Sequence, residues 1–119
     1  MKKINISHKL SLFSEYWSPK IIGSLNGQHV KLAKLQGEFI WHTHQHEDEL
    51  FFILKGALTI FFRDHTVQLK EGEMIIIPKG TEHKPVAEQE VSVMIFEPES
   101  TLNTGDVKGS LTQEQLDWI

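Results

Sequence analysis

Short apolar stretches separated by turn-forming residues run through most of the chain. Residues 50–54 (LFFIL), 57–62 (ALTIFF) and 74–77 (MIII) are rich in the β-branched and aromatic residues that favour strands. Glycine, proline, asparagine or aspartate separates such stretches at intervals of about ten residues. This alternation of short strands and turns predicts an all-β barrel or sandwich.

Two short helices are expected at the ends of the chain. Residues 5–13 (NISHKLSLF) place three apolar residues on one helical face, and Asn5 is suited to the N-cap. Residues 112–119 (TQEQLDWI) predict a second short helix, with Ser110 or Thr112 as its cap. Both helices would lie on the outside of the β domain.

A hairpin signal opens the predicted sheet. Residues 20–25 and 28–36 flank Asn26-Gly27, which predicts two antiparallel strands joined by a type I′ turn with both residues at positive φ. A later strand is expected at residues 90–96. Further turns are expected at Asp64-His65, Glu71-Gly72 and Pro78-Lys79-Gly80. The last fits a type I turn with proline second and glycine fourth.

The strand that begins at Glu49 is apolar on both faces. If Glu49 points into the barrel, Phe51 and Ile53 do so too, because side chains alternate along a strand. The other face, which runs from Leu50 to Leu54, is equally apolar. A strand of this kind needs cover on its outer face, and the short chain leaves little to supply it. We therefore expect a homodimer.

Three histidines and a glutamate carry the candidate chemistry. His42 and His44 are two residues apart, so their imidazoles point to the same face of an extended segment. A short polar connection can bring Glu49 back beside them. His83 follows the Pro78 turn and would arrive from a strand that is not adjacent in sequence. Imidazole and carboxylate groups in such an arrangement form a metal site.

These residues also resemble the two motifs of the cupin superfamily. The sequence differs from the usual pattern at two positions: Gly37 stands one residue nearer the first histidine, and Ala87 replaces an asparagine. The resemblance extends from Pro19 to Asp106 and includes the strings WHTHQHEDELFFILKG and FEPESTLNTGD, as in small cupins mostly of unassigned function. The matching residues are Gly37, His42-Thr43-His44, Glu49, Gly56, Gly72, Pro78-Lys79-Gly80 and His83.

The resemblance implies a double-stranded β-helix, the jelly-roll or cupin barrel. It implies one domain over residues 1–119, with the barrel core at about residues 19–98. It also implies one divalent metal ion, Zn, Fe, Mn, Ni or Co, held by four ligands. These ligands are His42, His44, Glu49 and His83.

Several residues near these four are not predicted to be metal ligands. His46 falls in the expected connection and is read as a rim residue outside the metal ligands. Glu47 and Asp48 suit a solvated turn, and either could orient an imidazole by accepting its free N–H. Trp41 points opposite to His42 and is read as a core residue. An apolar wall around the metal is expected from Phe51, Ile53 and Ile76 or their neighbours.

Composition narrows the function further. The net charge of −4 and the pI near 5.9 argue against a nucleic-acid partner, and the absence of cysteine excludes disulfides and thiol catalysis. Neither a signal peptide nor an apolar membrane span is recognisable, so a cytoplasmic protein is expected.

Three functions remain open. One is a metal-dependent isomerase or dioxygenase that acts on a small anionic metabolite, with His46 or Glu47 as general base. The second is a non-enzymatic sensor that binds a small polar or anionic ligand. The third is a barrel whose polar residues line a pocket without metal.

Overall fold

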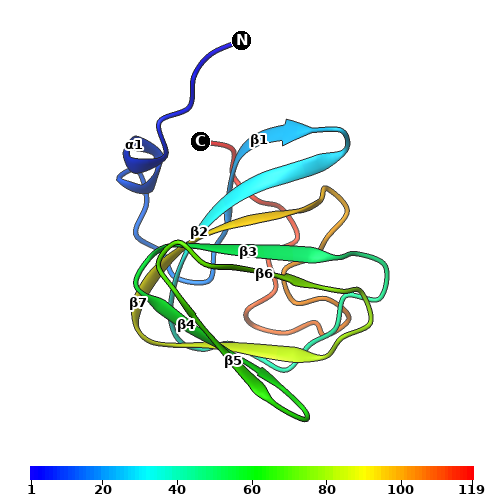
Figure 1. The fold of residues 1–119 in the computed structure, drawn as a ribbon. Coiled ribbons are helices and arrows are strands. Elements are labelled where there is room, and N and C mark those ends of the chain that lie inside the picture. The colour runs from blue at the N-terminus through cyan, green and yellow to red at the C-terminus, as the bar shows by residue number, and fades with distance from the viewer.

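A long antiparallel sheet organises the computed structural model, which describes residues 1–119 (Figure 1). Seven strands and one short helix make up the regular structure. They are α1 (Ile6–Leu10), β1 (Lys20–Leu25), β2 (Gln28–Glu38), β3 (Glu49–Lys55), β4 (Ala57–Phe62), β5 (Thr66–Lys70), β6 (Met74–Ile77) and β7 (His83–Pro98). None of the helices has the length and apolar character needed to cross a membrane.

Strand β7 closes the sheet on itself. The sheet order is β1-β2-β7-β3-β6, and β4 pairs with both β5 and β7. The first part of β7 lies beside β4, whereas the part after Val91 lies between β2 and β3. Strand β2 pairs with both parts of β7, and the register of this pairing shifts between Leu35 and Gly37. The result is the jelly-roll barrel that the sequence predicts.

The inner faces of the strands form one apolar core. Along β3, Glu49, Phe51 and Ile53 are buried and the residues between them are partly exposed, which confirms the predicted alternation. At about 25 cal/mol per Å² of buried apolar surface, this core is the main source of stability. Its members are Ala33, Leu35, Phe51, Ile53, Leu58, Ile60, Leu69, Ile77, Ala87, Val91, Val93 and Ile95.

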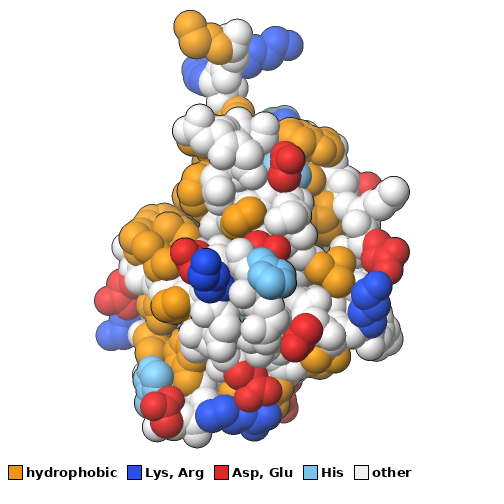
Figure 2. Space-filling view, turned by 90° about the vertical axis from the view of Figure 1, so that its right-hand side faces the viewer, with side chains coloured by type: hydrophobic (Ala, Val, Ile, Leu, Met, Phe, Trp, Pro, Cys, Tyr) orange, Lys and Arg blue, Asp and Glu red, His pale blue; other side chains and the backbone are white.

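The outer face of the sheet is covered only in part. A small cluster of Phe13, Ile22 and Leu32 packs beneath α1 and the adjacent chain ends. At the sheet edge, Met74 and Ile76 of β6 remain 53% and 55% exposed. On the face that Figure 2 displays, basic, acidic and apolar side chains are interspersed, and the N-terminal tail projects from the body of the molecule.

The chain ends differ from the prediction. Helix α1 is shorter than expected, although the Asn5 side chain does accept a hydrogen bond from the His8 N–H at 3.0 Å, as an N-cap should. The predicted C-terminal helix over residues 112–119 is wrong. That segment is irregular, and its end pairs with β1: Ile21 donates to Asp117 O at 2.9 Å and accepts from the Ile119 N–H at 3.1 Å. The edge strand β1 offers unpaired backbone groups, and pairing with them replaces helical hydrogen bonds.

The turns follow the sequence with one exception. Asn26 and Gly27 have φ of 51° and 77°, as expected for a type I′ hairpin. At the next predicted turn, the Thr81 N–H donates to Pro78 O at 3.2 Å, so proline is first and glycine third. Gly80 has φ of 81°, which is typical of a type II turn rather than the predicted type I. The strand expected at residues 90–96 begins earlier, at His83.

Candidate metal centre

Four buried side chains meet at one end of the barrel. His42 and His83 pair through their backbones, each N–H donating to the carbonyl of the other at 3.0 Å. His44 lies two residues further on, and Glu49 opens β3. Each of the four residues is at most 5% exposed. The structure thus brings together all of the residues that the sequence singled out.

The distances suit a single ion. The candidate ligand atoms of the four residues all lie within 4.8 Å of one another. Glu49 Oε1 is 3.3 Å from His83 Nε2 and 3.5 Å from His44 Nε2. Atoms that each bind one ion at about 2.1 Å stand roughly 3–4 Å apart, so small side-chain shifts would complete a coordination sphere.

Backbone carbonyls orient two of the imidazoles. His42 Nδ1 lies 2.9 Å from Ile40 O, and His83 Nδ1 lies 2.9 Å from Thr81 O. A carbonyl only accepts, so each Nδ1 carries the proton and each Nε2 presents its lone pair to the centre.

Glu47 and Asp48 do not orient these rings, contrary to one expectation. Glu47 accepts a hydrogen bond from the Ser100 hydroxyl at 3.2 Å, and Asp48 accepts one from the Lys79 N–H at 2.8 Å. The carboxylates are therefore engaged by the neighbouring loops. They fix the connection that leads into Glu49.

The third imidazole has no hydrogen-bond partner. Both ring nitrogens of His44 are buried without one. A buried polar group left unpaired costs on the order of 1–3 kcal/mol, so such a group calls for a partner. A metal ion bound to one nitrogen would provide it, and the residues present fit that group.

The protonation states of His42 and Glu49 suit the binding of a cation. Burial and the nearby His83 lower the pKa of His42 to about 4, so this imidazole is neutral near pH 7. Burial alone would raise the pKa of Glu49, but the adjacent His44 and His83 imidazoles outweigh it and hold that pKa well below its ordinary value. A neutral imidazole and an ionised carboxylate are the forms that bind metal.

A later loop supports the histidine segment, and sequence reasoning missed it. The Asp106 N–H donates to Thr43 O at 3.1 Å, and Asp106 Oδ1 accepts from the Thr43 N–H at 3.3 Å. Gly105 has φ of 60°, and a Cβ there would collide with Thr43 O. The resemblance already included this TGD string, but nothing in the sequence indicates which segment it contacts.

Three residues near the centre lie elsewhere than predicted. Trp41 is not a core residue, because its ring is partly exposed and packs under the Arg63 guanidinium at 3.8 Å. Ile76 does not line the centre, because it occupies the outer face of β6. His46 is exposed and outside the cluster of four, as its rim placement implied.

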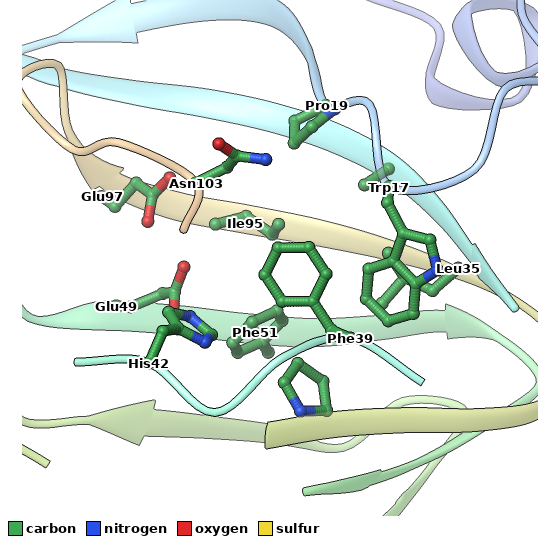
Figure 3. A pocket seen from close by; sticks show the side chains of 12 residues that line it. Trp17, Pro19, Leu35, Phe39, His42, Glu49, Phe51, Ile95, Glu97 and Asn103 are labelled. Carbon is green, nitrogen blue, oxygen red and sulfur yellow. The ribbon is translucent and has the colours of Figure 1, made fainter. Parts of the chain in front are cut away.

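A narrow apolar cavity leads to the centre (Figure 3). Its volume is about 40 Å³. Phe51 lines it as expected, whereas Ile53 does not. His42 and Glu49 lie at one end and Trp17 at the other (Figure 3). The lining residues are Trp17, Pro19, Ala33, Leu35, Phe39, His42, Glu49, Phe51, Pro85, Ile95, Glu97 and Asn103.

The sequence matches the Cupin_2 family, described as a cupin domain, over residues 28–98. This match covers more than half of the chain. The chain is a cupin. The matched region runs from the start of β2 to the end of β7, and so contains all four residues of the centre.

Related cupins share the fold. A crystal structure of a cupin-2 domain containing protein from Shewanella frigidimarina is 49% identical, covers 81% of this chain and 94% of its own, and has a TM-score of 0.80. Protein NMB1881 from Neisseria meningitidis is 34% identical, with coverages of 82% and 100% and a TM-score of 0.76.

A curated relative matches a shorter stretch. The uncharacterized protein YdbB of Bacillus subtilis is 45% identical over 64 residues, or 53% of this chain. The match spans 57% of that relative. None of the three descriptions states a substrate, so the activity has to be argued from the site.

Proposed function

We propose that this cupin binds one divalent metal ion through His42, His44, Glu49 and His83, and that the ion helps to hold a small molecule in the adjoining cavity. The observation that carries the proposal is the buried, unpaired imidazole of His44 within a group whose ligand atoms all lie within 4.8 Å. If the cluster had a purely structural role, the ring nitrogens of His44 would be hydrogen-bonded to other protein groups.

The charge of the loaded centre supports the same function. Three neutral imidazoles and one carboxylate leave a net charge of +1 around a divalent ion. When bound, such an ion polarises an oxygen ligand or lowers the pKa of a bound water. The donor set of nitrogen and oxygen suits Zn, Fe, Mn, Ni or Co.

Binding is the activity that the cavity favours. His46 and Glu47, the general bases expected for an isomerase or a dioxygenase, do not line the cavity. Its walls are mostly apolar and its polar groups gather at the end beside Glu49 (Figure 3). This arrangement suits recognition of a small molecule that has one polar end.

Metal analysis of purified variants tests the proposal. The protein is prepared without chelator or affinity nickel, and metal is measured per chain in the wild type and in His44→Ala, His83→Ala and His46→Ala. We expect about one ion per chain in the wild type and in the exposed control His46→Ala, and most of the metal lost from the other two. Full metal content in His44→Ala, or none in the wild type after incubation with zinc, would refute it.

A further inference from the structure

A second buried carboxylate, which the metal site does not require, faces the cavity. Glu97 lies near the end of β7 and is 3% exposed. Its Oε1 is 2.7 Å from the Lys31 Nζ on β2, and Lys31 is only 2% exposed. Figure 3 shows the Glu97 carboxylate on the same side of the cavity as Glu49. Lys31 therefore fixes the position of this side chain.

One oxygen of Glu97 has no partner. Oε2 is buried and accepts no hydrogen bond. The neighbouring Asn103 is held in place by other contacts, because its amide donates to Leu111 O at 2.9 Å and accepts from the Gln113 N–H at 2.8 Å. Apart from the candidate metal ligands, Glu97 is the cavity residue with a buried side-chain atom that has no hydrogen-bond partner. A buried oxygen of this kind needs a donor.

Aromatic rings form a wall along the cavity, with Trp17 at the end opposite His42 (Figure 3). Trp17 stacks on Phe39 with ring centroids 4.8 Å apart and planes 17° from parallel. The indole Nε1–H donates to Gln36 O, and the Trp17 backbone N–H donates to Lys34 O, each at 2.9 Å. Trp17 has φ of 57°, which is unusual for a bulky residue and is kept by these contacts. The wall gives the cavity a face for an apolar body.

We propose that Glu97 is a specificity-determining residue that selects a small hydroxylated molecule. The hydroxyl donates its hydrogen to Glu97 Oε2, and the apolar body packs against Trp17 and Phe39. The proposal deepens the proposed function, because the cavity adjoins the metal centre. It also narrows the ligand class expected from the sequence: a carboxylate has no hydrogen to donate to Glu97 Oε2, so a hydroxyl compound is preferred over an anion.

Three probes of similar shape test this preference. Phenol carries a donor, anisole carries the same ring without a donor, and benzoate carries an anion. Dissociation constants are measured by nuclear magnetic resonance titration of the zinc-loaded and the chelator-treated protein, with zinc content determined on each sample. A hydrogen bond that satisfies a buried oxygen supports a preference of about tenfold or more for phenol over anisole. Benzoate should bind more weakly than phenol.

Substitution of Glu97 assigns the preference to one side chain. Glu97→Gln keeps an oxygen for Lys31 and turns a donor toward the ligand, so the ratio of phenol to anisole affinity should fall to about one with zinc content unchanged. Glu88→Gln, an exposed change on the same strand, should keep the wild-type ratio. Glu97→Gln alone leaves the buried Lys31 without its anionic partner and could misfold for that reason. The double variant Lys31→Met/Glu97→Gln removes both members of the pair, and it should lose the phenol preference in the same way.

The outcomes separate this inference from the metal proposal. Normal zinc content without a phenol preference, or no phenol binding to the wild type at all, overturns the inference alone. A Glu97-dependent phenol preference in protein that binds no zinc supports the inference and refutes the metal proposal. Loss of zinc from Glu97→Gln overturns the inference, because Glu97 would then serve the metal centre.

Discussion

Replacing Gly105 by alanine should separate the late loop from the histidine segment. The added Cβ would collide with Thr43 O and lie 2.8 Å from the Thr43 carbonyl carbon, both of which are backbone atoms. Because backbone atoms cannot rotate away, the loop has to move. It then loses the two hydrogen bonds between Asp106 and Thr43.

The size of the effect follows from these contacts. An L-residue in the left-handed conformation costs about 1–2 kcal/mol, and each lost hydrogen bond about 1 kcal/mol more. The free energy of unfolding of Gly105→Ala should therefore fall by about 3–4 kcal/mol. For a chain of this size, roughly 4 °C per kcal/mol converts this into a melting temperature about 12–16 °C lower.

Two other glycines serve as controls that separate the conformational strain from the close contact with Thr43. The melting temperatures are measured by thermal unfolding with a chelator present. Gly72 has φ of 86° but nothing within 4 Å of its Cβ position, so Gly72→Ala measures the conformational strain alone, about 4–8 °C. Gly109 has neither a left-handed φ nor a close neighbour, so Gly109→Ala should melt near the wild type. If Gly105→Ala and Gly72→Ala lowered the melting temperature equally, the close approach to Thr43 would be wrong.

Three further predictions concern charge and assembly. In the metal-free protein the pKa of His42 is about 4 when folded against 6.5 as its ordinary value, so the unfolded chain takes up the proton first. Its stabilising contribution is complete above pH 6.5 and is lost as the pH falls toward 4, and urea titrations should show a shallower decline for His42→Gln. Lys31→Met removes the donor that holds the buried Glu97 Oε1 and should lower the free energy of unfolding by about 1–3 kcal/mol, measured by urea titration at neutral pH. Sedimentation should report a mass near twice 13.7 kDa, and Ile76→Lys on the exposed face of β6 should give a monomer; a monomeric wild type at micromolar concentration would contradict the expected dimer.

Local sequence patterns determined much of this protein's fold and candidate site. The alternation of Glu49, Phe51 and Ile53 fixes which face of β3 turns inward, because a pleated strand leaves no other choice. Asn26-Gly27 determined its hairpin, since both residues reach positive φ at low cost. The spacing of the histidines likewise predicted that they would meet, and the structure brings them together.

Contacts between distant segments decided the rest. The C-terminal segment has a helical pattern, yet its last residues pair with Ile21 of β1 because an edge strand offers them backbone partners. Trp41 lies outside because Arg63, from the β4–β5 hairpin, packs over its ring. Glu97 enters the cavity only because β7 runs between β2 and β3, where Lys31 meets it. Such pairings depend on how the sheet closes, and residues 31 and 97 carry no local signal of each other.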